Sequence, residues 1–228
     1  MPENGDIWTF IELLRHRISR GYVYYYKFEQ RKPQKDNEIS RYYKSNLKKY
    51  QRTYRKHALG LRNYFYMRYN STGIVLASEG KPDLDLRHIE QFFKDIRKDP
   101  LHLRISDITE LVIHAQQRKS RRTFKVNIYL SKYTLDVIKA NLLQILKIHA
   151  NPPKSQQKQA KSAIKRAWLV NGYPSFCGLL EQKKALRSWY VKEARVRGIN
   201  IPIQELKLSF FRRNRLKQII TVKEVSYA

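Results

Sequence analysis

Tyrosines and basic residues are concentrated together in the N-terminal part of this chain. Eleven of the 16 tyrosines lie between Tyr22 and Tyr69. The overlapping segment from Arg15 to Tyr69 contains sixteen lysines and arginines but only three acidic residues. A tyrosine ring can stack on an unpaired base, whereas lysine and arginine neutralise phosphates. This combination predicts a surface that binds nucleic acid.

The predicted contacts in this segment fall into two groups. Expected strands present tyrosines to bases, and a basic helix lies along the phosphates. The alternative is that the tyrosines are core residues of an antiparallel sheet and reflect β-propensity. The predicted base contacts are Tyr24, Tyr26, Tyr64 and Tyr66. The predicted phosphate contacts are Lys44, Lys48, Arg52 and Arg55.

Three further basic clusters follow along the chain. Residues 116–122 predict a hairpin tip whose charge can clamp phosphates, although a solvated tip needs no partner. Residues 175–197 predict an amphipathic helix, an element that DNA-binding regulators also use to read sequence. A weaker cluster surrounds residue 213. The predicted contacts from these clusters are Arg118, Lys119, Arg121, Arg122, Lys183, Lys184, Arg187, Arg195, Arg212 and Arg213.

The segment from Asp83 to Glu110 combines carboxylates with the histidines His88 and His102, and His114 follows it. Converging carboxylates can hold the divalent metal of a nuclease. However, His102 and His114 lie in expected strands, where structural histidines are the commoner outcome. No nuclease pattern or glycine-rich phosphate loop is present. We therefore predict no catalytic residue, metal or cofactor, and keep a nuclease or a recombinase of a mobile element as the alternative.

The charge of the chain identifies the class of partner. Lys+Arg 47 against Asp+Glu 19 gives a formal net charge of +28. The hydrophobic fraction of 42% is too high for a disordered basic tail. From residue 78 to 110, eight acidic residues meet six basic ones, and basic blocks flank this segment. We expect a folded protein whose flanking blocks grip a polyanion.

Several features indicate the compartment. The single cysteine, Cys177, excludes an internal disulfide and favours a reducing compartment. No apolar run approaches the ~20 residues that a membrane span needs. Residues 1–6 are polar and acidic, unlike a secretory signal. We expect a cytoplasmic protein without a membrane partner.

The N-terminal elements follow from periodicity and turn signals. Asp6 can cap a helix that ends near Gly21, and a strand follows at residues 22–28. Residues 38–59 lack proline and glycine, which predicts one long helix that ends at Gly60. One apolar stripe of that helix comprises Tyr43, Leu47, Tyr50, Tyr54 and Ala58.

The complete pattern predicts an α+β fold, an antiparallel sheet of about five or six strands packed with helices and followed by a basic, mostly helical C-terminal region. The turn residues at 70–73 predict a β-hairpin. The prolines at 152–153 end a helix and predict domains of residues 1–150 and 151–228. Strands are expected at 63–69, 74–78, 101–105, 111–115 and 123–130, helices at 85–93, 131–150, 155–170 and 175–197, and a strand or hairpin at 206–222.

Taken together, these observations predict a nucleic-acid-binding protein, with RNA favoured over DNA. Tyrosine density and dispersed charge suit irregular or single-stranded surfaces better than one groove. A non-catalytic component of a ribonucleoprotein complex, with protein partners there, fits the composition. A nucleic-acid-processing enzyme and a DNA-binding regulator remain as alternatives.

Overall fold

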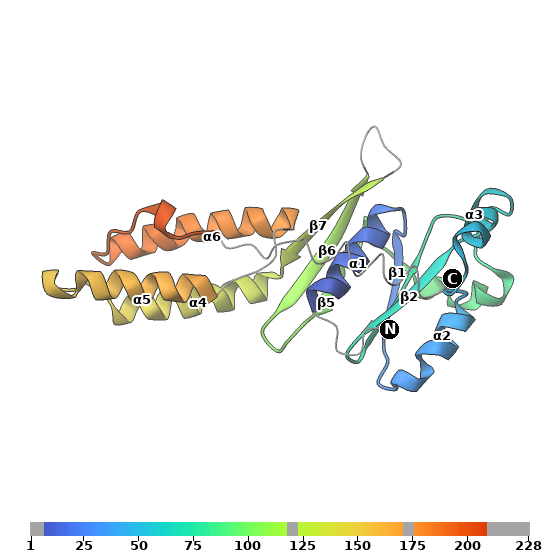
Figure 1. The fold of residues 1–228 in the computed structure, drawn as a ribbon, viewed down its shortest axis with the longest axis horizontal. Coiled ribbons are helices and arrows are strands. Elements are labelled where there is room, and N and C mark those ends of the chain that lie inside the picture. The colour runs from blue at the N-terminus through green and yellow to red at the C-terminus, as the bar shows by residue number, and fades with distance from the viewer. Residues whose placement is uncertain (1–6, 118–122, 171–175, 209–228) are drawn as a thin grey trace. The chain divides into compact units, whose positions relative to one another are not determined.

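The computed structural model describes residues 7–117, 123–170 and 176–208. The fold is α+β, as predicted, but its strands form two sheets of four and three strands rather than one sheet of five or six (Figure 1). The chain divides into two compact units. The first comprises residues 1–101 and 113–126, and the second comprises residues 102–112 and 127–228. The double proline lies inside the second unit rather than at this division.

The first unit is built on a four-stranded antiparallel sheet. Its strands are β1 (Tyr24–Glu29), β2 (Tyr64–Tyr69), β3 (Thr72–Ala77) and β4 (Lys94–Asp95), in the order β2-β3-β1-β4. The predicted hairpin is confirmed, because β2 and β3 pair from Tyr64↔Ala77 to Tyr69↔Thr72. Asn70, in the connecting turn, has a φ of 49°, a left-handed conformation that asparagine tolerates.

Alternation along β2 sends its side chains to two different environments. On one face Tyr69 packs on Phe10 of α1 (Ile7–Ser19), with ring centroids 5.5 Å apart. On the other face Tyr64 and Tyr66 join a buried cluster with Val75 of β3. The helix that the sequence predicts before Gly21 is therefore present and covers one face of the sheet (Figure 1).

The predicted helix at 38–59 is wrong, because two short helices replace it. These are α2 (Asp36–Tyr42) and α3 (Lys49–His57), and the 3₁₀ turn η1 (Pro33–Lys35) precedes them. The end of α2 is a Schellman motif, in which the Ser45 amide donates to the Ser40 carbonyl (2.8 Å). Lys44, with a φ of 50°, occupies the position that glycine usually takes.

Contacts distant in sequence hold this break in place. The Ser45 hydroxyl accepts a hydrogen bond from the backbone amide of Tyr66 on β2 (2.8 Å). The Lys44 ammonium donates to Asp83 (3.1 Å). Tertiary contacts thus override a helical propensity that no proline or glycine interrupts. The 3₁₀ helix η2 (Leu84–Phe92) follows Asp83, close to the helix expected at 85–93.

The remaining strands are β5 (Leu101–Arg104), β6 (Glu110–Gln117) and β7 (Phe124–Leu130), which form a sheet in that order. They confirm the strands expected at 101–105, 111–115 and 123–130. Helix α4 (Lys132–Ile148) follows, and the hydroxyl of its N-cap Ser131 accepts from the Thr134 amide. This cap satisfies an amide that the first helical turn leaves without an intrahelical partner.

In the second unit, α4 packs beside α5 (Gln157–Val170) and α6 (Cys177–Val196), with the 3₁₀ turns η3 (Lys154–Gln156) and η4 (Ile203–Glu205). Trp168 and Tyr190 stack in its core, with ring centroids 6.1 Å apart. The helices expected at 155–170 and 175–197 are present. Most of the strand expected at 206–222 lies outside the described residues. No helix within the described ranges has the length and apolar character of a membrane span.

Candidate nucleic-acid interface

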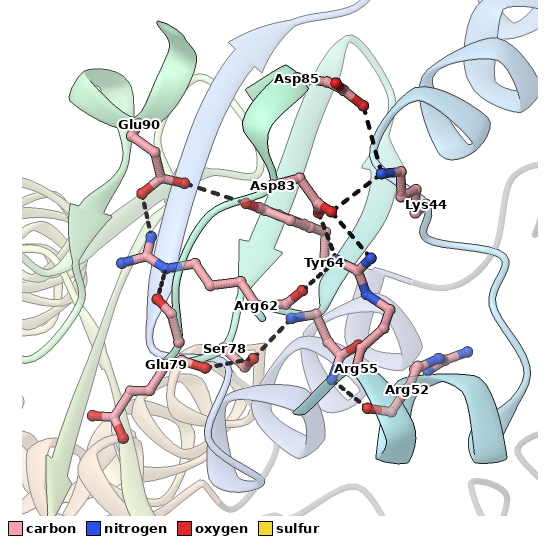
Figure 2. A network of polar contacts seen from close by, with 12 residues as sticks. Lys44, Arg52, Arg55, Arg62, Tyr64, Ser78, Glu79, Asp83, Asp85 and Glu90 are labelled. Carbon is pink, nitrogen blue, oxygen red and sulfur yellow. Dashed lines mark hydrogen bonds and ion pairs between the residues drawn. The ribbon is translucent and has the colours of Figure 1, made fainter. Parts of the chain in front are cut away.

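Helix α3 is attached to the first unit by an ion pair. The Arg55 guanidinium donates to both oxygens of the Asp83 carboxylate, over 3.1 Å to Oδ1 and 2.5 Å to Oδ2. Lys44 reaches the same carboxylate from the end of α2 (Figure 2). The Asp83 side chain is only 8% exposed. A bidentate arginine–carboxylate contact restrains the relative orientation of the two groups in addition to its favourable charge interaction, so it orients α3.

Further polar contacts complete the attachment of α3. The Asn63 side chain donates to the Arg52 carbonyl (2.9 Å), and Arg55 donates to the Arg62 carbonyl (2.8 Å). The Arg52 guanidinium donates back to the Leu47 carbonyl (2.8 Å). No residue of α3 is buried. The helix is therefore held by hydrogen bonds and charge rather than by an apolar face.

This attachment leaves the tyrosines of α3 on its outer side. Tyr50 is 68% exposed and Tyr54 is 61% exposed. The sequence predicted one stripe that joins Tyr43, Tyr50 and Tyr54. However, Tyr43 lies at the C-terminal end of α2, not on α3, and is buried. The outward face of α3, as we call it below, comprises the exposed residues Lys49, Tyr50, Thr53, Tyr54, Lys56 and His57.

The Asp83 carboxylate is ionised and stabilised by its partners. Burial alone would raise its pKa, but hydrogen bonds from Arg55 and Lys44 outweigh burial and hold the pKa below its usual value. The ion pair is therefore intact at neutral pH.

Two of the tyrosines predicted as base contacts are core residues instead. Tyr64 is 1% exposed and Tyr66 is 3% exposed. Their hydroxyls donate to Glu90 (3.3 Å) and Asp36 (2.7 Å), respectively. Burial is the first cause that raises the pKa of each hydroxyl. The prediction is wrong for both, because the chain itself covers the rings that a base would need.

The other two predicted base contacts are half-buried and engaged. The Arg62 guanidinium lies 4.3 Å from the centroid of the Tyr24 ring, and Arg62 also pairs with Glu90 (Figure 2). The Tyr26 ring lies 5.2 Å from that of Phe28 and 5.8 Å from that of Phe92. Both tyrosines thus contribute to packing on the sheet.

The predicted phosphate contacts of this region separate into two kinds. Lys44 and Arg55 pair with Asp83, and Arg52 binds a backbone carbonyl. Lys48 is exposed, and its backbone amide donates to Gln51 at the start of α3 (2.8 Å). Of these four residues, Lys48 is the one that lies on the surface without an ion pair among the described residues.

The predicted contacts on helix α6 also separate into exposed residues and residues that face the core. Lys184 and Arg195 are exposed, together with Lys192 on the same side of the helix. Lys183 is buried, and burial lowers the pKa of its ammonium. Arg187 is half-buried and donates to the Leu206 carbonyl (3.4 Å). Hence Lys184 and Arg195 lie on the surface, whereas Lys183 and Arg187 face the core.

Six predicted contacts lie outside the described residues. They are Arg118, Lys119, Arg121, Arg122, Arg212 and Arg213.

The carboxylates considered for a metal site make other contacts. Asp95 accepts from the Arg97 guanidinium (2.7 Å), and Asp99 pairs with Lys94 (2.8 Å). The His114 ring lies 3.1 Å from the Arg97 carbonyl, a hydrogen-bonded position typical of a structural histidine. Within the described ranges, no group of three or more His, Cys, Asp or Glu residues is arranged to hold a metal ion.

Sequence reasoning missed Tyr50 and Tyr54 as surface residues. Their spacing was visible as one stripe of a long helix, but they were not among the predicted nucleic-acid contacts. The signal that distinguishes the alternatives is that the sequence of α3, KYQRTYRKH, contains no aliphatic residue to share a core with them. Comparisons with family models, curated proteins and solved structures found no match for this chain.

Proposed function

We propose that this protein binds nucleic acid without catalysing a reaction on it, and that RNA is preferred over DNA. The observation that carries the proposal is the outward face of α3. There Tyr50 and Tyr54 lie exposed beside Lys49, Lys56 and His57, and the helix contains no acidic residue. Aromatic rings interleaved with cations are the combination that proteins use to bind nucleic-acid strands.

The ion pairs of the first unit strengthen this argument. The acidic segment uses carboxylates internally, as in Asp83 with Arg55, Glu90 with Arg62 and Asp95 with Arg97. These pairs neutralise cations that hold the fold together. The large excess of positive charge, +28 in total, therefore belongs to the other basic residues. A surface of this kind attracts a polyanion.

Helix α6 supports the same function from the second unit. Lys184, Lys192 and Arg195 share one exposed side of this helix. Cations placed along a helix contact phosphates of any sequence and add affinity without reading bases. Basic faces in both units suit an irregular RNA inside a ribonucleoprotein complex better than a single duplex groove.

The proposal is tested on the full-length protein purified at low salt. Absorbance at 260 and 280 nm reports any co-purified nucleic acid, separate digestion with RNase and DNase identifies its type, and sequencing identifies the protected fragments. A protected RNA supports the proposal. Protected duplex DNA with a short consensus supports a DNA-binding regulator, and cleavage of the added nucleic acid supports an enzyme.

A titration of labelled 20-nucleotide RNA then measures the ionic part of binding. With ~6–10 phosphate contacts, affinity falls by roughly three to five orders of magnitude between 50 and 200 mM salt for a duplex and somewhat less for a single strand. An affinity that does not change over this range contradicts binding through phosphates.

A further inference from the structure

The two tyrosines of α3 are spaced for bases that are not stacked on each other. Tyr50 and Tyr54 are separated by four residues in one helix, so they lie on the same side, ~6 Å apart along the axis. Successive bases of one strand in a duplex lie ~3.4 Å apart. Two adjacent bases can therefore each meet a tyrosine ring only after they separate from one another.

Base pairing also restricts the access of bases to the two tyrosine rings. In a duplex, base faces are covered by neighbouring bases, and only the edges are open in the grooves. Tyr50 and Tyr54 project from the outer side of a helix whose surroundings also include Lys49 and Lys56. Rings at such a surface reach the face of a base only where the base is unpaired.

The composition of α3 favours a nucleic-acid strand over a protein as the occupant of this face. The nine residues of the helix include four Lys/Arg and His57, but no acidic and no aliphatic residue. The centres of protein–protein interfaces are depleted in charged residues, especially lysine. In the described part of the chain, neither the Tyr50 ring nor the Tyr54 ring packs on another ring or under a cation. The rings are thus open, and the charge around them complements phosphate.

We propose that the outward face of α3 binds an unpaired strand, with Tyr50 and Tyr54 stacked on two bases and Lys49 and Lys56 on the flanking phosphates. This inference rests on the proposed function and specifies its ligand as a single strand rather than a duplex. Arg55 and Asp83 act as positioning residues, because their ion pair turns the tyrosines outward.

The test compares affinities for one fluorescein-labelled 20-nucleotide RNA, free and annealed to its complement. Replacing one ring by alanine, as in Tyr50→Ala or Tyr54→Ala, should weaken binding of the free strand about five- to 160-fold, the range that corresponds to base–aromatic stacking. Binding of the duplex should change less than twofold. The variant Tyr50→Phe/Tyr54→Phe should bind the strand as wild type does, because the rings are kept.

Tyr133→Ala is the matched control, since Tyr133 of α4 is 60% exposed and should be dispensable. Equal losses for strand and duplex, or no loss in the alanine variants, would overturn the inference while the proposed function stands. A wild-type protein that binds neither form would instead contradict the proposed function itself. The inference about α3 would also be overturned if wild type, but not the alanine variants, captured a protein and the variants lost no RNA affinity.

Discussion

Arg55 and Asp83 lie 28 residues apart in the sequence and form the two-pronged ion pair that fastens α3 to the first unit. Both side chains are largely removed from solvent, at 12% and 8% exposure. Because α3 has no buried residue, this pair takes the place that an apolar face has in most helices. The orientation of Tyr50 and Tyr54 therefore depends on electrostatics.

Replacing Asp83 by asparagine should destabilise the protein by about 3 kcal/mol. The change leaves the charges of Arg55 and Lys44 without their shared carboxylate, and loss of one member of a buried pair typically costs about 3–5 kcal/mol. Urea denaturation followed by circular dichroism measures the free energy of unfolding.

The matched control is Asp85→Asn. Asp85 also faces Lys44, at 3.7 Å, but its side chain is 78% exposed. An exposed pair contributes little, so we expect a change below about 0.5 kcal/mol. Equal effects of the two substitutions would show that Asp83 does not anchor α3.

Acid should weaken the fold through Asp83 and Asp95. The pKa of each carboxyl lies below its ordinary value: burial opposes this, but hydrogen bonds from Arg55 and Lys44 at Asp83, and from Arg97 at Asp95, outweigh it. The native state thus holds these protons less tightly than the unfolded chain. Their stabilisation is complete above the unfolded pKa of about 3.9 and is lost as the pH falls through the native values.

The free energy of unfolding, measured in urea from pH 6 to pH 2, tests this dependence. We expect a decline that begins near pH 4–5 and is shallower in Asp83→Asn, which removes one of the two groups. A variant with the same pH dependence as wild type would exclude Asp83 as a source of the acid sensitivity.

Gly73→Ala should destabilise the sheet by about 1–3 kcal/mol through overpacking. A Cβ atom at Gly73 would lie 2.8 Å from the ring of Phe28 on the paired strand. That ring is stacked between Tyr26 and Tyr66, with centroids 5.2 and 6.2 Å away, so it has little room to move. Thermal or urea denaturation measures this change in the free energy of unfolding.

The double variant Gly73→Ala/Phe28→Leu provides the control. If the clash is with the ring, the glycine substitution should cost less in the Phe28→Leu background, and the two effects should not add. Full additivity would place the cause in the backbone of β3 instead.

Two adjacent lysines of α6 should have opposite roles. Lys184 is exposed, so Lys184→Gln should weaken RNA binding and lower the slope of log affinity against log salt by about 0.7–0.9, the value for one phosphate contact. Lys183 is buried in the second unit, so Lys183→Gln should change the free energy of unfolding but not that slope. Titration of RNA into each variant at several salt concentrations measures the two slopes. A reduced slope in Lys183→Gln would contradict the assignment.

Local signals predicted much of this fold. Residues 70–73 indicated the hairpin because their turn chemistry suits a short connection, and the prolines at 152–153 indicated the end of the helix that precedes them. The alternation of β2 also grouped Tyr64 with Tyr66 correctly. These features are decided within a few residues of the chain.

Features decided by distant contacts were not predictable in the same way. The break between α2 and α3 at Lys44 depends on contacts with Tyr66 and Asp83, and no proline or glycine between residues 38 and 59 indicates it. The face of β2 that is covered depends on packing, so the sequence left open whether Tyr64 was core or surface. The same break separates Tyr43 from Tyr50, so the predicted stripe is divided between a buried residue and an exposed one. The division of the strands into two sheets likewise depends on pairing across the chain.

The polar attachment of α3 also determines how the helix responds to temperature. Heat capacity rises mainly when apolar surface enters water, and release of a helix with no buried residue exposes little of it. The enthalpy and entropy of local opening of α3 should thus vary little with temperature, so its free energy should change almost linearly with temperature, unlike the curved dependence of global unfolding. Backbone amides of α3 should exchange with deuterium sooner than those of β3, whose residues from Gly73 to Ala77 are all buried. We therefore expect α3 to open locally more often than the sheet to which it is attached.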